Sequence, residues 1–175
     1  LVRSRGLGDV YKRQVYFKRM RFAMAHEPNE HLELRIDKFT FRFPKTLRYS
    51  EAGLWIKREG SLVRLGLSDF AQQRSGDIAF ANLAPAGTVL DVGDEVASIE
   101  TVKVNVSLPS PVKGTIRAVN SSLQEAPELI NQDPYGKGWI AVVESEALEL
   151  PLSQLLDAEA YFDLARHQAE AEMKS

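Results

Sequence analysis

The middle of the chain, from Leu54 to Val143, alternates apolar and polar residues in short runs that Gly, Pro, Asn and Asp residues separate. Alternation with a period of two is typical of half-buried β-strands. Many short strands with regular turn signals predict an all-β barrel or sandwich. The expected strands cover residues 54–58, 62–67, 78–83, 95–100, 104–108, 113–119 and 139–144. Two short helices are expected between them, near residues 68–74 and 126–131.

The two flanks of this region have different patterns. Residues 32–49 alternate apolar and charged side chains up to Pro44, which predicts one extended edge segment that packs on the main domain. Towards the C-terminus, apolar residues recur at roughly helical spacing after Ser153, and serine is a residue type that caps helix N-termini. We therefore expect a C-terminal helix over residues 153–173.

Two segments of the central region share a short pattern. Residues 87–93 and 114–120 both read Gly-Thr, a β-branched residue, two variable residues, Val, and then Gly or Asn. Either they are two copies of one supersecondary unit, or two strands simply begin with Gly-Thr. If two copies pair about a pseudo-twofold axis, the midpoint between them falls beside Lys103. Val102 and Lys103 would then lie in the turn of a protruding hairpin.

Composition narrows the chemistry that such a fold can perform. The chain has 175 residues, 44% of them hydrophobic, and a mean hydropathy of -0.24, which fits about one globular domain and excludes a bilayer-spanning run. It contains no cysteine, which excludes disulfides, thiolate metal sites, iron–sulfur clusters and a cysteine nucleophile. His26, His31 and His167 lack paired metal-ligand spacing, so we predict no metal site. Any sulfur chemistry has to come from a cofactor.

The net charge of -2 hides a basic leader and an acidic remainder. Residues 1–22 hold only Asp9 as an acid, against seven basic side chains: Arg3, Arg5, Lys12, Arg13, Lys18, Arg19 and Arg21. The leader lacks the serine content and amphipathic spacing of a transit peptide, and no nucleic-acid-binding fold follows it. We interpret residues 1–23 as a non-native or disordered tail and predict no nucleic-acid or membrane partner. We expect a bacterial cytoplasmic protein, or a mitochondrial one if the leader is a transit peptide.

One lysine stands out because of its surroundings. Lys103 ends residues 100–103 (Glu-Thr-Val-Lys), and residues 110–114 (Ser-Pro-Val-Lys-Gly) follow it. Here the sequence resembles the H protein of the glycine cleavage system, a lipoyl-bearing carrier in which a Glu-Ser-Val-Lys hairpin precedes Ser-Pro-Val-x-Gly. Residues 131–139 match the family's Asn-x-x-Pro-Tyr-x-x-Gly-Trp. Similar stretches extend the resemblance from about Leu47 to Ala165: residues 66–72, 76–83, 127–131 and 155–161.

The resemblance implies a mostly β fold of the lipoyl/biotinyl type, a barrel-sandwich hybrid with short helices and a C-terminal helix. It implies a lipoyl-carrier domain at residues 47–175 and leaves residues 24–46 as an N-terminal extension. In this family a lysine is amidated with lipoate, so Lys103 is the implied attachment site, with Glu100 and Val102 beside the cofactor. Biotin is a poorer match, because biotinyl carriers usually flank the lysine with methionines. The dithiolane of lipoate would supply the sulfur that the chain lacks.

The resemblance also implies a function and a set of partners. The lipoyl arm would carry an aminomethyl group from glycine decarboxylase (the P protein) to the aminomethyltransferase (the T protein). Dihydrolipoyl dehydrogenase (the L protein) would reoxidise the arm, and a lipoate ligase or lipoyl transferase would attach it. The chain itself would act as a non-catalytic carrier, expected to be a monomer, that replaces diffusion by a high effective concentration.

Two positions depart from the family pattern. H proteins have a Ser-His-Glu-Trp run and an Asp four residues after the lysine, whose carboxylates help to hold the cationic aminomethyl group. Here the run begins at Ala52 and has Leu54 in place of the Glu, and Ser107 replaces the Asp. An ammonium group drawn into a cleft without a partner loses hydration with little return. We therefore keep an alternative, an H-like lipoyl carrier for lipoate relay or sulfur-compound oxidation, and a third interpretation, a β-barrel with an unmodified Lys103.

Overall fold

The computed structural model describes residues 30–145 and 154–175. The leader at residues 1–23 and the predicted helix cap Ser153 lie outside these ranges. Within them, no helix is long and apolar enough to cross a membrane. The strands are β1 (His31–Ile36), β2 (Phe39–Pro44), β3 (Arg48–Tyr49), β4 (Leu54–Glu59), β5 (Leu62–Leu67), β6 (Ile78–Leu83), β7 (Val89–Leu90), β8 (Glu95–Thr101), β9 (Asn105–Pro109), β10 (Gly114–Val119) and β11 (Trp139–Glu144). The helices are α2 (Asp69–Ser75), the 3-10 helix η1 (Ser121–Gln124), α3 (Leu129–Gln132) and α4 (Ala158–Met173).

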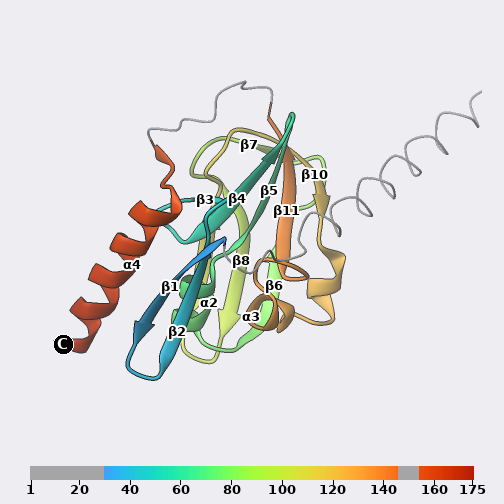
Figure 1. Cartoon of the computed structure of the whole chain (residues 1–175). Coiled ribbons are helices and arrows are strands. Elements are labelled where there is room, and N and C mark those ends of the chain that lie inside the picture. Colours follow the sequence, from blue (N-terminus) through green and yellow to red (C-terminus); the bar gives the residue numbers. More distant parts are fainter. Residues whose placement is uncertain (1–29, 146–153) are drawn as a thin grey trace, which may run out of the picture.

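Two antiparallel sheets enclose the main apolar core (Figure 1). Six strands form the larger sheet in the order β3-β4-β5-β11-β10-β7, and three form the smaller sheet in the order β6-β8-β9. The larger sheet contributes Leu65 and Val143 to the core, and the smaller sheet contributes Ile99 and Leu108. All four side chains are at most 1% exposed. This arrangement confirms the predicted mostly β, barrel-sandwich fold.

The strand predictions hold in the central region and fail in the N-terminal flank. All seven predicted central strands are present, with ends that differ by at most one residue. The single extended segment predicted over residues 32–49 is wrong, because the chain reverses after Ile36 and β1 pairs with β2, with Ile36 opposite Phe39. Asp37 adopts a φ of 54° in this two-residue turn. Tight hairpins require such left-handed backbone angles, and Asp tolerates them better than most residues.

Helix α2 has its predicted length and begins one residue later than expected, whereas the other two predicted helices are shorter. Helix α4 begins five residues later than expected, directly after Asp157, whose carboxylate accepts a hydrogen bond from the Ala160 amide over 2.8 Å. Asp is among the strongest helix caps, so it fixes the first turn. Leu156 lies before the helix and bridges to Tyr49 instead of continuing the helical pattern. The helix expected over residues 126–131 is reduced to α3, with η1 before it.

A second cluster of buried side chains joins the β1–β2 hairpin to α4 and the larger sheet. This aromatic cluster comprises Leu34, Phe41, Phe43, Leu47, Tyr49, Trp55, Phe70, Tyr135, Ala158, Tyr161 and Ala165. The Tyr49 and Tyr161 rings stack with centroids 4.6 Å apart, and Phe43 meets Tyr161 edge-on at 5.5 Å. The Tyr161 hydroxyl lies 2.7 Å from the Ser68 hydroxyl. The N-terminal hairpin is therefore packed into the fold.

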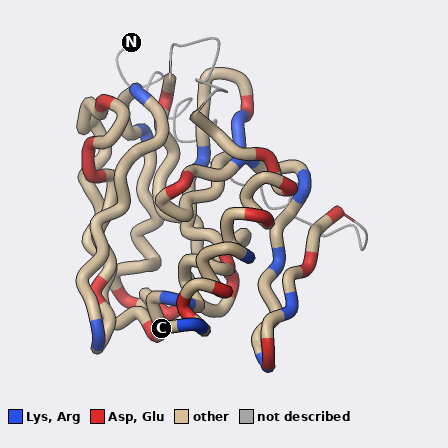
Figure 2. The backbone as a smooth tube through the Cα atoms, turned by 90° about the vertical axis from the view of Figure 1, so that its left-hand side faces the viewer, with Lys and Arg blue, Asp and Glu red and all other residues tan. Residues whose placement is uncertain are grey.

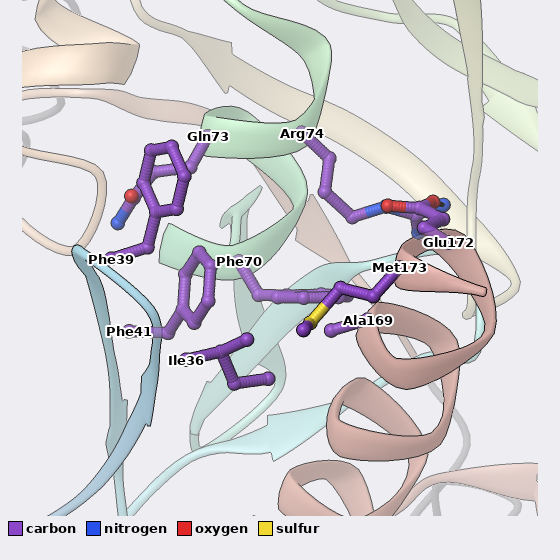
Figure 3. Close-up of a pocket in the computed structure, with 9 residues that line it drawn as sticks. All are labelled: Ile36, Phe39, Phe41, Phe70, Gln73, Arg74, Ala169, Glu172 and Met173. Carbon is purple, nitrogen blue, oxygen red and sulfur yellow. Dashed lines mark hydrogen bonds and ion pairs between the residues drawn. The ribbon is translucent and has the colours of Figure 1, made fainter. Parts of the chain in front are cut away.

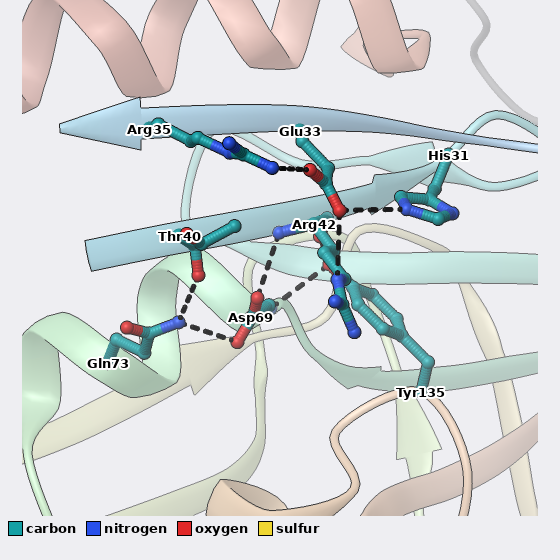
Figure 4. A network of polar contacts seen from close by, with 8 residues as sticks. All are labelled: His31, Glu33, Arg35, Thr40, Arg42, Asp69, Gln73 and Tyr135. Atoms are coloured by element: carbon teal, nitrogen blue, oxygen red, sulfur yellow. Dashed lines mark hydrogen bonds and ion pairs between the residues drawn. The ribbon is translucent and has the colours of Figure 1, made fainter. Parts of the chain in front are cut away.

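Polar contacts also fix the hairpin to the central region (Figure 4). The Arg42 amide donates to a carboxylate oxygen of Asp69 over 2.8 Å, and the Tyr135 hydroxyl donates to the Arg42 carbonyl over 2.5 Å. The same hydroxyl accepts from the Asp69 amide over 3.1 Å. Gln73 donates to the Thr40 carbonyl over 3.0 Å. Asp69 and Tyr135 both belong to the family-like motifs, so the hairpin is anchored on residues of the carrier region.

Candidate functional site

Lys103 lies in the turn between β8 and β9, as the sequence predicted. Its two neighbours in the turn are exposed, Val102 by 96% and Val104 by 46%. The lysine side chain is itself exposed, and its ammonium group forms no hydrogen bond or ion pair within residues 30–145 and 154–175. Figure 1 shows the β8–β9 turn at the same end of the molecule as the β1–β2 turn and the C-terminal end of α4. The amine is therefore accessible to a partner.

The side chain of Thr101 holds the backbone of this turn. Its hydroxyl accepts from the amides of Lys103 over 3.2 Å and Val104 over 3.1 Å, and it donates to the Val104 carbonyl over 3.2 Å. The Thr101 amide also donates to that carbonyl over 2.9 Å. Serine and threonine hydroxyls can both make such turn contacts, so the threonine in place of the family's serine retains the chemistry. The backbone is fixed while the lysine side chain is free.

The two Gly-Thr segments pair with each other. β7 and β10 are antiparallel, with Val89 opposite Thr115, and β8 and β9 are antiparallel, with Ile99 opposite Val106. In both pairs the two partners lie at nearly equal distances along the chain from Lys103. The lysine turn is therefore the midpoint of both pairings, as the pattern predicted. Any nested hairpin has this register, so the pairing fits both interpretations of the shared Gly-Thr pattern.

Glu100 lies on the outward face of the smaller sheet, opposite Phe80 on β6. Directly opposed residues of antiparallel strands share one face. One Glu100 carboxylate oxygen accepts from the Asn82 side chain over 3.3 Å. Phe80 is 64% exposed, although its spacing from the buried Ile78 would place both on the core side. A bulge between these two residues changes the face, and the sequence pattern gave no signal of this exposed ring.

The structure changes the interpretation of Leu54 and Ser107, the two residues that replace family carboxylates. Leu54 is fully buried in the core between the sheets, so a carboxylate at that position would lie in apolar surroundings. Ala52, two residues earlier, is exposed. Ser107 is exposed on β9, and its hydroxyl donates to the carboxylate of Glu95 on β8. The positions of Leu54 and Ser107 themselves carry no carboxylate, but the neighbouring strand supplies one beside Ser107.

The long motif at residues 131–139 has a structural role. The Asn131 side chain donates to the Gly76 carbonyl and accepts from the Ile78 amide, both over 3.0 Å, which ties α3 to the start of β6. The Trp55 indole donates to the Pro134 carbonyl over 2.9 Å, which fixes the same segment to β4. These contacts join the smaller sheet and the larger sheet to the same segment, and they give the Asn131 side chain and the Pro134 backbone carbonyl a structural role.

An apolar pocket lies apart from the lysine turn, between the hairpin, α2 and α4 (Figure 3). It has a volume of about 290 Å³, and its walls include the rings of Phe39, Phe41 and Phe70. At its edge Arg74 forms an ion pair with Glu172. The two charged groups neutralise each other, and the lining holds no nucleophile. The pocket could therefore hold an apolar group, but its lining has no side chain that could react with one.

The histidines are not gathered into a site. His31 lies 3.3 Å from a carboxylate oxygen of Glu33, and His167 lies 2.6 Å from the Asp163 carbonyl. His26 lies outside the described residues. In the part of the chain that the structure describes, no group of three or more His, Cys, Asp or Glu side chains could hold a metal ion.

Comparisons with known proteins point to one family. The family model for the glycine cleavage H-protein matches residues 47–168. A glycine cleavage system H protein from Geobacillus thermodenitrificans is 43% identical over 118 residues, which cover 67% of this chain and 92% of the relative. A glycine cleavage system H protein from Carboxydothermus hydrogenoformans is 41% identical over 127 residues, which cover 73% of this chain and 97% of the relative. Both sources are bacteria, and these matches give no support to a mitochondrial leader.

A solved structure shares the fold. The crystal structure of a glycine cleavage system H protein from Mycobacterium marinum superposes with a TM-score of 0.62 at 28% sequence identity. The match covers 73% of this chain and 99% of that chain. The family match, the level of identity and the shared fold lead to one conclusion: the chain belongs to the glycine cleavage H-protein family.

Proposed function

We propose that Lys103 carries lipoate and that the chain thereby acts as the lipoyl carrier of the glycine cleavage system. The observation that carries this proposal is the exposed amine of Lys103 on a turn whose backbone Thr101 holds. Family membership supports it, because H proteins carry lipoate on a lysine. An accessible amine on a fixed turn suits a group attached through an amide bond.

The residues of this chain would position the arm rather than react. Lipoate, when attached, supplies a dithiolane that can be opened and closed. The Thr101 contacts restrict motion to the lysine side chain and whatever is attached to it, so the arm would pivot about one point. Tethering then replaces diffusion by a high effective concentration at each partner. On this basis we assign the chain a carrier role without catalysis.

The partners follow from the family. A glycine cleavage H protein works with the P, T and L proteins of that system. We propose that a lipoate ligase or lipoyl transferase loads Lys103. We propose that the carrier acts as a monomer. The start of the family match at residue 47 supports a division into an extension at residues 24–46 and a carrier region from residue 47 onwards.

Glu95 bears on the alternative of a carrier for lipoate relay or sulfur-compound oxidation. That alternative rests on the loss of carboxylates at the positions of Leu54 and Ser107. The contact between Ser107 and Glu95 supplies a carboxylate beside one of them, on the exposed side of the smaller sheet. The glycine cleavage role is therefore the function that the site favours.

The site assignment is tested by mapping lipoylation. The chain is co-expressed with a lipoate ligase and examined by intact mass and peptide mapping. We expect one lipoyl group on Lys103, and none in Lys103→Arg. Lys113→Arg is the matched control, because Lys113 is also exposed and follows the same hairpin. Modification that persists in Lys103→Arg, or that is lost in Lys113→Arg alone, would overturn the assignment.

The pathway is tested by complementation. A bacterial strain without its own H protein receives the wild-type chain or Lys103→Arg, and growth on glycine as one-carbon source is measured. Growth with the wild type and not with the variant is the expected result. A lipoylated wild-type chain that fails to restore growth would favour the alternative carrier.

A further inference from the structure

Exposed apolar side chains gather around the lysine turn. Within the described residues, seven large apolar side chains are exposed: Phe39, Phe80, Val89, Val92, Val102, Val104 and Met173. Three of these seven lie close to the lysine. Phe80 lies opposite Glu100 on the neighbouring strand, and Val102 and Val104 flank Lys103 in the turn between Glu100 and its partner Asn105. Opposed side chains on neighbouring strands lie about 5 Å apart. The Phe80 ring is therefore a close neighbour of Glu100 and of the turn.

Folding does not explain the position of Phe80. It lies on β6, an edge strand of the smaller sheet, on a face that otherwise carries short polar side chains. The polar neighbours on that face are Asn82, Ser98, Asn105 and Ser107. The ring is 64% exposed, so it contributes little buried area to the core. An exposed ring on an edge strand also favours unwanted association, which natural sheets usually avoid with charged residues.

We propose that Phe80 is the docking contact for the enzyme that attaches lipoate to Lys103. This inference rests on the proposed function. The partner surface would present an apolar recess for the Phe80 ring and a basic group for the Glu100 carboxylate beside it. Buried aromatic anchors next to matched charges are the contacts that dominate protein interfaces. Val102 and Val104 would lie along the same interface, because an enzyme that reaches Lys103 has to enclose its turn.

The reaction at Lys103 makes such a contact necessary. The attaching enzyme presents lipoate activated as an acyl adenylate. The Lys103 amine, after loss of a proton to solvent, attacks the acyl carbon and forms the amide C–N bond. The bond between the acyl carbon and the phosphate oxygen breaks, AMP leaves with that electron pair, and the second amine proton goes to solvent. The amine has to be held at the acyl carbon while this happens.

The attaching enzyme depends on this surface more than the other partners do. Enzymes that act on the loaded carrier also contact the arm, which adds to their binding. The attaching enzyme meets the chain while Lys103 is bare, so its binding has to come from the protein surface, of which the turn and its neighbours lie nearest to the reacting amine. Among these neighbours, Phe80 offers the largest apolar side chain that is not already buried.

The test measures the rate of lipoylation of purified variants. Wild type, Phe80→Ala and Val89→Ala are incubated with a lipoate ligase, lipoate and MgATP, and the mass gain at Lys103 is followed over time. We expect kcat/KM for the carrier to fall about tenfold in Phe80→Ala. Val89→Ala is the matched control, because Val89 is 72% exposed but lies on β7 of the larger sheet, and its rate should stay within about twofold of wild type. Phe80→Tyr, which keeps the ring, should restore most of the rate.

A second measurement separates docking from damage to the turn. The reaction of Lys103 with a small amine-reactive ester needs no docking, so it should be equal in wild type and Phe80→Ala. A parallel loss in this reaction, or an unchanged ligase rate in Phe80→Ala, would overturn the inference. Neither result would affect the proposed function. If the ligase does not modify Lys103 in the wild type, the proposed function itself fails.

Discussion

Two phenylalanines show how the chain uses the same side chain in two regions of the molecule. Phe43 is fully buried in the aromatic cluster, where it meets the Tyr49 and Tyr161 rings edge-on. Phe80 is 64% exposed on the smaller sheet, beside the lysine turn. The buried ring holds the N-terminal hairpin to the fold, whereas the exposed ring is available to a partner. Stability and recognition therefore reside in different regions and can be changed separately.

The largest expected effect comes from removing the buried ring. Phe43→Ala should lower the free energy of unfolding by about 3–5 kcal/mol, because it removes packing at a fully enclosed site. Phe80→Ala should change it by no more than about 0.5 kcal/mol. Urea unfolding followed by tryptophan fluorescence measures both values. Equal losses in the two variants would contradict the division between the regions.

A smaller effect should appear at alkaline pH. Burial raises the pKa of Tyr161 to about 12 and also raises the pKa values of Tyr49 and Tyr135 above their ordinary range. The folded state favours the neutral phenol. The contribution of the buried phenol to the free energy of unfolding is therefore full below pH 10 and is lost as the pH rises through 12. For Tyr161 alone this amounts to about 2–3 kcal/mol.

Urea unfolding at a series of pH values from 8 to 12 checks this dependence. Tyr161→Phe should be less stable at pH 8, because it loses the contact with the Ser68 hydroxyl, and should lose less stability as the pH rises. Phe80→Ala should keep the wild-type pH dependence. A Tyr161→Phe curve that falls as steeply as the wild type between pH 10 and 12 would show that the alkaline loss has another origin. Figure 2 shows Lys, Arg, Asp and Glu residues spread over the whole backbone, so Phe80→Ala is needed as a baseline for charge effects that do not come from Tyr161.

The smallest effect should be confined to the lysine turn. Thr101→Val removes the hydroxyl that bonds the Lys103 and Val104 amides. We expect these two amides to exchange with solvent about three- to tenfold faster, which corresponds to about 1 kcal/mol, while the midpoint of global unfolding stays unchanged. Thr101→Ser keeps the hydroxyl and serves as the control. Unchanged exchange in Thr101→Val would mean that another contact fixes the turn.

The strands and the lysine turn were predictable from local signals. Alternation marked seven central strands to within one residue but not the two-residue β7, and the repeat centred on Lys103 indicated its hairpin. The N-terminal hairpin was missed because its turn has no Gly or Asn at the reversal, and Asp37 carries the left-handed angle instead. The start of α4 was missed because helical spacing continues before the Asp157 cap. Each error comes from a single aspartate. Asp37 reverses the chain and Asp157 caps the helix, although the apolar pattern around each of them continues.

The chemistry of the site was predictable only in part. Lys103 was found through a motif, but Phe80 was not, because a bulge in β6 decides which face it occupies. Glu95 was also missed, because it is distant from Ser107 in sequence and meets it only through the pairing of β8 and β9. Alternation fixes neither bulges nor cross-strand partners, which depend on register.

The place of Lys103 in the strand pairing has a consequence for how this protein can change over time. The lysine lies in the turn between β8 and β9 and takes part in none of the strand pairs on either side of it. A substitution of Lys103 therefore removes the amine without removing a strand contact. A substitution of Thr101 instead removes the contacts that hold the Lys103 and Val104 amides in place. The amine can be lost in a single step, whereas its position is tied to the residue two places before it.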